Sequence, residues 1–502
     1  MTLPELFAPT FRDRAGDTAL EWACQEYTFG DLDARASRMA AALSARGLTS
    51  GDRLALYLPN RIEYVDLFLA CTRLGVIVVP INVLYREREL RHILTDAAPR
   101  ALVLENPEWD RSSMASWEVE VWPVDDLAHD PLRRQLAVPD PPLSPDTPAA
   151  IVYTSGTTGA AKGAVLTHGS LTANARTLVD AWQITARDRF LLALPLFHVH
   201  GLGNGLHCWL LSGCRTRLLE RFDHQSAAAT LLDFRPTLFF GVPTMYVRLL
   251  EVEATDAPEI GAGLRLCVSG SAPLAAHVLD AFEARYGARI LERYGMTETL
   301  MTVSNPYDGE RRAGTVGLPL PGVATRIVDS DGVEVPVEVE GELLVRSPTL
   351  FAGYWNRPDA TAQAFAGGWF KTGDIARRSA DGYITLCGRG SDLIISGGFN
   401  IYPREIEDVI AEHPSVAEVA VAAVPEARRG EVPVAYVVRK GDVDGETLIA
   451  WCRERVASFK VPRRVVFLER LPRTALGKVQ KSLLPITSHE DAKNTEAGQK
   501  RG

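Results

Sequence analysis

Apolar positions along the first part of the chain follow helical spacing in some segments and form short unbroken runs in others. Thr28 is predicted to begin a helix, with Asp31 as a partial capping box, because apolar residues recur every three or four positions after it, at Leu32, Ala36, Met39 and Leu43. Gly47 is expected to end this helix. The stretches "RLALYLP", Ile62–Gly75 and "VIVVPIN" then predict strand, helix and strand. Strands that are apolar at every position indicate a parallel α/β sheet covered on both faces.

A second structural unit is predicted to begin near residue 390. The segment "GRGSD" is small, polar and flexible, and a helix is expected after it at Pro403–Glu412. Two strands, "VAEVAVAAV" and "VPVAYVV", a helix at Glu446–Val456 and a strand "RVVFLE" complete an α+β pattern. We therefore expect a large core domain at 1–389, a small mobile domain at 390–487, and a disordered tail at 488–502, which has almost no large apolar residues.

Composition narrows the class of protein. The chain has 502 residues, 46% hydrophobic and 23% charged, which is typical of a soluble globular protein. Its net charge of -9 argues against a nucleic-acid surface. Seven scattered cysteines without a C-x-x-C pair indicate a reducing compartment. No signal peptide is expected at the N-terminus, and the most apolar region, Val65–Tyr85, is too interrupted to span a bilayer. A cytoplasmic location is therefore expected.

A glycine-rich loop, "YTSGTTGAAKG" at Tyr153–Gly163, follows a predicted buried strand. Its glycines let backbone N–H groups converge. Hydroxyl groups and one cation are added by Thr154, Ser155, Thr157, Thr158 and Lys162. The pattern is not a Walker loop, because the lysine lies three residues after Gly159 and a glycine follows it. We interpret the loop as a phosphate cradle; the alternative is a Ser/Thr-rich surface turn.

Arg293 and Glu298 flank the glycine-bent turn of the short segment "LERYGMTETLM", Leu291–Met301. Arg293 comes just before a Tyr-Gly turn, and Glu298 follows five residues later. Their presence among mostly uncharged residues indicates a site for charged ligands.

These motifs together resemble those of the adenylate-forming enzymes, the family of acyl-CoA synthetases, luciferases and adenylation domains. The resemblance covers nearly the whole chain, in the family's order: the glycine-rich loop, "YGMTE" at 294–298, "TGD" at 372–374, "GRGSDLIISGGFNIYPREIE", and "RTALGKVQK". It implies an α/β fold with a large N-terminal domain of parallel-type sheets and a small mobile α+β C-terminal domain. One departure is Ala161, where the family often has proline before the loop lysine.

The resemblance also implies a chemistry. A carboxylate attacks the α-phosphate of ATP, pyrophosphate leaves, and the acyl-adenylate is formed with Mg²⁺ as cofactor. Thr154 and Glu298 are expected to bind the metal through oxygen atoms. Asp374 is expected to bind the ribose, assisted by Arg389, and Lys478 is expected to contact the carboxylate and the α-phosphate. The nucleotide-binding set is completed by Ser155, Gly156, Thr157, Thr158, Gly159, Lys162, Gly270, Ser271, Ala272, Tyr294, Gly295, Met296 and Thr297.

The second half-reaction in this family is thioester formation with coenzyme A. The small domain rotates about a hinge, which is expected here at Ser391. Rotation removes Lys478 and brings the loop Ser396–Asn400 to the active site. Ser396, Gly397 and Gly398 are expected beside the pantetheine arm, since glycines leave room for it.

The residue before the Tyr-Gly turn lines the acyl pocket in this family, and relatives that use fatty or aromatic acids commonly have a small or neutral residue there. A guanidinium against an apolar chain would cost several kcal/mol. A second carboxylate on the substrate would pair with Arg293, worth roughly 1.5–3 kcal/mol. Together with "PLFHVHGL", "FGVPTMY" and "SNPYDGERRAGTVG", this resembles the malonyl-CoA synthetases. His200 and Ser269 are then expected near malonate, with His198 catalytic beside the thiol channel.

Other interpretations remain open from the sequence. Arg293 could form a structural salt bridge, and either histidine could be structural. The chain could then be a short- or medium-chain monocarboxylate:CoA ligase. It could also load a carrier protein, since pantetheine is common to both acceptors, or be a non-catalytic nucleotide-binding relative. Methylmalonate is a plausible second substrate, and the sequence leaves the oligomeric state unknown.

Overall fold

The computed structural model describes residues 1–105, 119–129, 139–154, 161–253, 255–396, 399–426, 430–456, 458, 460–473 and 479–485. They divide into two compact units. The first consists of Met1–Val339, Leu343–Thr372 and Arg378–Thr385, and the second of Glu340–Glu342, Gly373–Arg377 and the chain from Leu386 onward. The chain passes between the units more than once, and its last crossing lies close to the boundary expected after residue 389. The expected tail lies outside the described residues.

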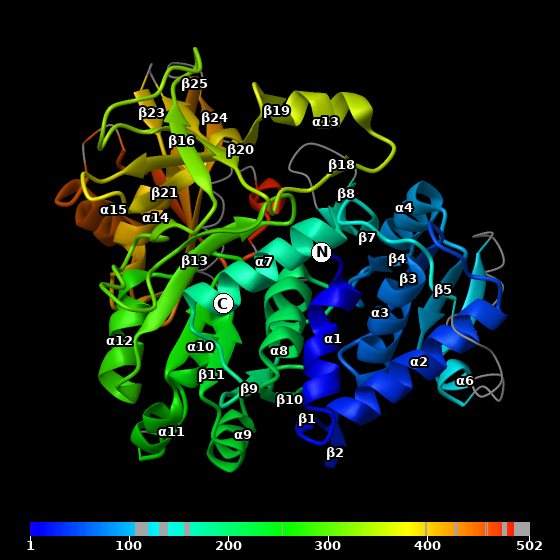
Figure 1. Cartoon of the computed structure of the whole chain (residues 1–502). Helices are drawn as coiled ribbons and strands as arrows, with labels where there is room; N and C mark the ends of the chain where they lie inside the picture. Colours follow the sequence, from blue (N-terminus) through cyan, green and yellow to red (C-terminus); the bar gives the residue numbers. More distant parts are fainter. Residues whose placement is uncertain are drawn as a thin grey trace, which may run out of the picture. The chain divides into compact units, whose positions relative to one another are not determined.

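A seven-stranded sheet occupies one side of the first unit (Figure 1). Its order is β18 (Gly353–Tyr354), β8 (Lys162–Thr167), β7 (Pro148–Thr154), β4 (Ile77–Pro80), β3 (Arg53–Tyr57), β5 (Ala101–Leu104) and β6 (Glu120–Pro123). The neighbours from β7 to β6 are parallel, whereas β7–β8 and β8–β18 are antiparallel. The helices in this part of the chain are α2 (Phe29–Ala45), α3 (Ile62–Leu74), α4 (Glu87–Ala97) and α6 (Val124–Ala128).

A nine-stranded sheet forms the other layer of the same unit. Its order is β15 (Leu318–Pro319), β14 (Leu300–Ser304), β13 (Ile290–Met296), β12 (Leu266–Ser269), β11 (Leu238–Gly241), β9 (Arg189–Leu192), β10 (Arg215–Leu218), β1 (Thr18–Trp22) and β2 (Gln25–Thr28). All pairs from β13 to β1 are parallel. The remaining helices are α1 (Leu3–Asp13), α7 (His168–Ala181), the π-helix η2 (His200–Leu206), α8 (His207–Ser212), α9 (Ala227–Phe234), α10 (Pro243–Leu249), α11 (Ala257–Gly263) and α12 (Ala276–Tyr286).

A third sheet contains the crossings between the units. It comprises β16 (Ala324–Val328), β17 (Gly341–Arg346), β20 (Trp369–Arg378) and β19 (Phe365–Ala366), with β21 (Ile384–Arg389) paired to β20; α13 (Pro358–Ala364) precedes β19. The second unit has its own sheet, of β23 (Phe399–Ile401), β22 (Ile394–Ser396), β25 (Gly430–Arg439), β24 (Val416–Glu426) and β26 (Arg464–Phe467). Its helices are α14 (Pro403–Ala411) and α15 (Gly445–Arg453), with 3₁₀ turns η3 (Gly390–Asp392) and η4 (Lys481–Leu483).

The local predictions from hydrophobic spacing are confirmed. Thr28 caps α2 with a full capping box, and Asp31 accepts a hydrogen bond from the Thr28 N–H at 2.9 Å. The predicted apolar stripe of α2 is buried in the core that also contains β3 and α3. In the second unit, Ile406 and Ile410 of α14 pack with Val421 and Val437 of the sheet. Among the described residues no helix is both long and apolar enough to cross a membrane.

One buried ion pair joins α2 to α3. Arg35 donates from Nε and Nη2 to the two carboxylate oxygens of Asp66, at 3.1 and 2.6 Å, and Asp66 is fully buried. This two-pronged geometry is the favourable form of an Arg–carboxylate pair. The pair fixes how the two helices lie against each other.

Asp66→Asn should lower the free energy of unfolding of the first unit by roughly 1.5–3 kcal/mol, because Arg35 loses a charge-assisted hydrogen bond and keeps only Glu63 among the described residues, at 3.6 Å, as a counter-charge. Urea denaturation measures this value. Asp13→Asn, which alters the exposed pair with Arg12, is the matched control and should leave the midpoint unchanged. Equal midpoints for the two variants would contradict a stabilising role for the Arg35–Asp66 pair.

Candidate active site

The β7–β8 hairpin frames the predicted phosphate loop. β7 ends at Thr154, β8 begins at Lys162, and these two residues are paired across the hairpin. The Thr154 hydroxyl donates to the Lys162 carbonyl at 3.4 Å. Ser155, Gly156, Thr157, Thr158 and Gly159 lie outside the described residues, so their contacts with phosphate remain a prediction.

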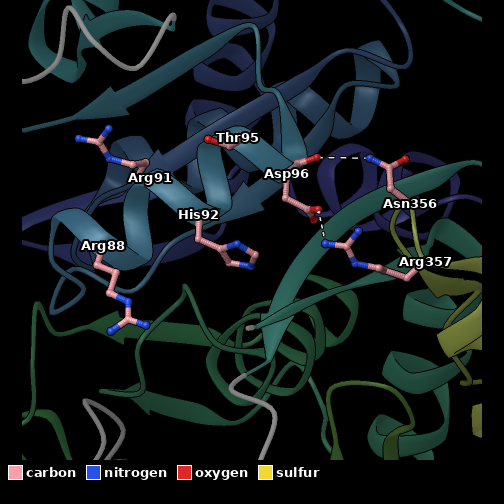
Figure 2. A pocket seen from close by; sticks show the side chains of 7 residues that line it. All are labelled: Arg88, Arg91, His92, Thr95, Asp96, Asn356 and Arg357. Atoms are coloured by element: carbon pink, nitrogen blue, oxygen red, sulfur yellow. Dashed lines mark hydrogen bonds and ion pairs between the residues drawn. The ribbon is translucent and has the colours of Figure 1, made fainter. Parts of the chain in front are cut away.

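Helix α4 braces the base of this hairpin. His92 Nε2 is 2.7 Å from the carbonyl oxygen of Ala161, which can only accept, so Nε2 carries the hydrogen. Asp96 accepts from the Tyr153 hydroxyl at 2.7 Å. Its carboxylate also pairs with Arg357 at 3.2 Å (Figure 2). Beside these contacts lies a hollow of about 500 Å³, lined by Arg88, Arg91, His92, Thr95, Asp96, Asn356 and Arg357. The loop therefore begins and ends on a rigid frame.

Glu298, one of the two predicted metal ligands, is held by Tyr354. The Tyr354 hydroxyl donates to Glu298 Oε1 at 2.9 Å, and the Phe351 N–H donates to the Glu298 carbonyl at 2.8 Å. The ring of Tyr354 lies 5.0 Å from Lys162 Nζ, within cation–π range. Because Lys162 pairs with Thr154, one continuous set of contacts connects both predicted metal ligands and the loop lysine.

The "YGMTE" segment forms the hairpin between β13 and β14, with a bulge between Tyr294 and Gly295. A Cβ at Gly295 would lie 1.9 Å from the Leu300 carbonyl oxygen, so the turn excludes any side chain there. The Met296 N–H donates to the Thr299 hydroxyl at 3.2 Å and tightens the turn. Thr297 follows at the tip, and Glu298 is buried just beyond it.

Arg293 is buried on β13. Its side chain is 3% exposed, and its Nε and Nη2 atoms have no hydrogen-bond partner among the described residues. Burial lowers the pKa of its guanidinium to about 9, and Tyr246 and Glu292 partly oppose this shift. The group is therefore still protonated at neutral pH. The structure gives no support for a salt bridge of Arg293 to a described neighbour.

His200 and Ser269 also have unpaired polar atoms. His200 is 2% exposed with Nε2 unpartnered, and Ser269 is fully buried with its hydroxyl unpartnered among the described residues. Burial, together with the charges of Arg293 and His198, holds the pKa of His200 well below its usual range, so the ring is neutral at pH 7. The three residues predicted for malonate are thus all buried with unsatisfied polar atoms, an arrangement that requires explanation in a native site.

The orientation of the two histidines follows from their neighbours. The His198 Nδ1 atom accepts from the His200 backbone N–H at 3.2 Å, so neutral His198 carries its hydrogen on Nε2. Burial and Arg293 lower the pKa of His198 to about 4. His200 Nδ1 lies 3.2 Å from the Ser271 hydroxyl, and Ser271 has a left-handed backbone with φ of 70°. If that hydroxyl donates, His200 Nε2 carries the hydrogen and is a donor without a partner among the described residues.

The predicted residues of the second unit form separate groups. Asp374 is buried and pairs through Oδ1 with Arg389 Nε at 2.7 Å. Ser396 is buried on β22, next to the strand β23. The predicted hinge residue Ser391 lies in η3. Lys478, Gly397 and Gly398 lie outside the described residues, so their roles remain predictions.

Sequence reasoning missed the supports of this site. Tyr354 is 56 positions from Glu298, and His92 is 69 positions from Ala161. No local spacing links residues that far apart. The sequence signal that could have drawn attention to Tyr354 is the cluster "FAGYWNRP", in which two aromatic residues follow a glycine.

Comparison with known proteins agrees with this architecture. Residues 7–355 match the family model "AMP-binding enzyme", and residues 405–478 match "AMP-binding enzyme C-terminal domain". The crystal structure of ATP-bound MatB from Rhodopseudomonas palustris is 39% identical, with a TM-score of 0.89 over 96% of this chain and 98% of that one. The malonate–CoA ligase of Arabidopsis thaliana is 34% identical, covering 96% of this chain and 88% of the relative. The feruloyl-CoA synthase of an Amycolatopsis species is 36% identical, covering 93% and 94%.

The chain belongs to the AMP-binding enzyme family. The expected fold, a large α/β N-terminal part with a small C-terminal domain, is confirmed. The expectation of an acid–thiol ligase is also confirmed, since CoA ligases and synthases match nearly the whole chain. Relatives with similar sequence identity to this chain are named after different acids, so sequence identity alone does not indicate which acid this chain uses.

Tyr354→Phe should weaken binding of magnesium-ATP by about tenfold, because Glu298 loses a hydrogen bond to a charged group, worth roughly 1.5–3 kcal/mol. The phenyl ring keeps its contact with Lys162. Isothermal titration calorimetry measures the binding, and thermal denaturation reports folding.

Tyr27→Phe is the control, because the Tyr27 hydroxyl donates to Gln25 at the exposed surface and touches neither Glu298 nor Lys162 among its described contacts. Wild-type affinity in Tyr354→Phe would show that Tyr354 does not position Glu298.

Proposed function

We propose that this chain is an AMP-forming malonate:CoA ligase. The observation that supports this most strongly is the set of unpaired buried polar atoms on Arg293, His200 and Ser269. A cation, a neutral imidazole and a hydroxyl are a donor set suited to a carboxylate. An acid with a single carboxylate would use it at the phosphate and leave these donors unpaired.

The energetics favour an anionic tail on the substrate. A protonated guanidinium buried without a partner costs several kcal/mol. The distal carboxylate of malonate would accept hydrogen bonds from Nε and Nη2 of Arg293, and charge-assisted pairs of this type are about twice as strong as neutral ones. The substrate itself would thus compensate the cost.

In the first half-reaction, an oxygen of the proximal carboxylate attacks the α-phosphate of ATP and pyrophosphate leaves. Negative charge on the phosphate oxygens would be stabilised by Lys162 and by the backbone N–H groups of the loop. Gly270, Ser271, Ala272, Tyr294, Gly295, Met296 and Thr297 would line the nucleotide, with Asp374 and Arg389 at the ribose. Lys478 would contact both the carboxylate and the α-phosphate.

A magnesium ion fits the residues present. Glu298 and Thr154 offer oxygen atoms, the donor type that magnesium prefers. When bound, the ion would neutralise charge on the ATP phosphates. The hydrogen bond from the Tyr354 hydroxyl holds the Oε1 atom of Glu298 in place.

In the second half-reaction, the thiol of coenzyme A attacks the acyl carbonyl and AMP leaves. We propose that the small domain, 390–487, rotates about Ser391 for this step and brings Ser396, Gly397 and Gly398 to the pantetheine arm. His198 would stand at the thiol channel as a neutral ring. Its fixed tautomer leaves it a donor at Nε2 and no base at Nδ1.

Two other functions fit the same fold. A monocarboxylate:CoA ligase would leave the Arg293 donors unsatisfied, so the pocket geometry argues against it. Loading of a carrier protein is chemically equivalent at the pantetheine thiol. Pyrophosphate release with malonate, methylmalonate, butyrate and sulfoacetate, with and without coenzyme A, separates these functions. Sulfoacetate tests whether the pocket requires a planar carboxylate or accepts any distal anion.

Arg293→Ala should change the acid preference. Malonate loses its charge partner, at roughly 3–5 kcal/mol, which is at least about a hundredfold in kcat/KM. Butyrate has no distal charge, so its kcat/KM should stay the same or rise. Arg293→Lys is the matched variant, because lysine keeps the positive charge but lacks the planar guanidinium that binds a carboxylate through two hydrogen bonds. Its kcat/KM for malonate should lie between those of the wild type and Arg293→Ala.

An equal fall for malonate and butyrate in Arg293→Ala would show that Arg293 is structural. The dicarboxylate proposal would then fail, while the family assignment would stand.

Lys478→Ala should reduce adenylation by about a hundredfold or more, the scale of a lost transition-state donor. Thioester formation from supplied malonyl-adenylate should continue, because Lys478 serves the first half-reaction alone. Rapid-quench assays of the two half-reactions measure both rates. Equal losses in both would contradict the assigned role.

A further inference from the structure

Gly270 lies directly after β12 and is buried. A Cβ built on it would meet Arg293 Cζ at 2.3 Å, Nη1 at 2.4 Å and Nε at 2.6 Å. These are its three nearest atoms, and all belong to one guanidinium. The guanidinium therefore occupies the space that a side chain at position 270 would need.

The backbone itself does not require glycine here. Gly270 has no left-handed φ, unlike Gly317 at 95° or Gly353 at 139°. At Gly295 and Gly261 the obstacle to a side chain is backbone, 1.9 Å away at Leu300 O and nearer still at Tyr286 O. At Gly270 the obstacle is a charged side chain. Glycine at this position is thus explained by the position of Arg293.

The contact also determines where the guanidinium can act. Gly270 lies against the guanidinium atoms Cζ, Nη1 and Nε. The hydrogen-bond donors Nε and Nη2 of the same group are buried without a partner among the described residues. A methyl group at 270 would push this group out of its present position. A shift of about 1 Å in a positioned group is enough to cost roughly a hundredfold in rate.

We propose that Gly270 is a specificity-determining residue, which seats the Arg293 guanidinium so that the pocket accepts acids with a distal anionic group. The family resemblance implies that Gly270 lies in the wall shared by the adenine and the acyl group, and in the structure Gly270 lies against the Arg293 guanidinium. The proposal rests on the proposed function, since it concerns the same pocket. Gly270 acts through Arg293, so it is a positioning residue and not a catalytic one.

The experiment is a double-mutant cycle with Gly270→Ala, Arg293→Ala and the combined variant. For each, kcat/KM is measured with malonate and with butyrate, and KM with ATP. Gly270→Ala should lower malonate kcat/KM by roughly tenfold to a hundredfold. Because Gly270 also belongs to the proposed nucleotide wall, the test uses the ratio of kcat/KM for malonate to kcat/KM for butyrate, in which an effect on ATP common to both acids cancels. This ratio should fall by roughly tenfold to a hundredfold. Gly263→Ala, whose new Cβ meets nothing closer than 3.4 Å, is the matched control and should behave as wild type.

The cycle decides whether the effect passes through Arg293. In the combined variant the guanidinium is absent, so Gly270→Ala should lower the ratio no further than Arg293→Ala does. The same fall of the ratio in both backgrounds, an equal loss with butyrate, or unchanged malonate kcat/KM would each overturn the proposal. A failure of Arg293→Ala to change the acid preference would instead overturn the proposed function.

The same variants also distinguish a folding defect from a loss of specificity. If Gly270→Ala does not fold because of the clash, removal of the guanidinium must restore the thermal transition in the combined variant. A combined variant that remains unfolded would show that the methyl group collides with something other than Arg293, which overturns the proposal.

Discussion

A buried cation that has no partner for two of its nitrogen atoms among the described residues is the feature on which the proposed acid specificity depends. Arg293 extends from β13 of the nine-stranded sheet, and its Nε and Nη2 atoms are unsatisfied among the described residues. Burial lowers the pKa of the group, yet leaves it charged at neutral pH. A fold that retains such a cation is destabilised unless a ligand completes it. His200 and Ser269 likewise have buried polar atoms that lack a hydrogen-bond partner among the described residues.

The nucleotide side is built in the opposite way, with its groups already paired. Glu298 is held by Tyr354, the Ala161 carbonyl by His92, and Tyr153 by Asp96. The segment 351–357 supplies Tyr354 and also Arg357, which pairs with Asp96, and part of it pairs as β18 with β8. Such preorganisation keeps charged groups in place at the moment of phosphoryl transfer. The proposed site therefore combines paired groups on the side of ATP, which all these ligases would use, with unsatisfied buried donors on the side of the acid, which differs among the relatives.

Local structure could be predicted from the sequence, whereas the long-range contacts that hold the motif residues could not. The Thr28 cap and the α14 stripe follow from rules that act over a few residues. Arg293 drew attention because a charge is unusual in its apolar context. That its donors have no partner depends on which strands and loops surround it, and Gly270 faces it only after β12 and β13 pair. Tyr354 was missed for the same reason, since its partner Glu298 is far away in the sequence.

The central claim is that the distal carboxylate of the acid is bound by Arg293, and binding of two intermediate analogues tests it most directly. One is malonyl-sulfamoyladenosine, and the other is its methyl ester, which has the same adenosine and linker but no distal charge. Calorimetry at neutral pH should show the charged analogue binding the wild-type protein at least about tenfold more tightly, the lower bound for a charge-assisted pair. Equal affinities, or tighter binding of the ester, would contradict the account.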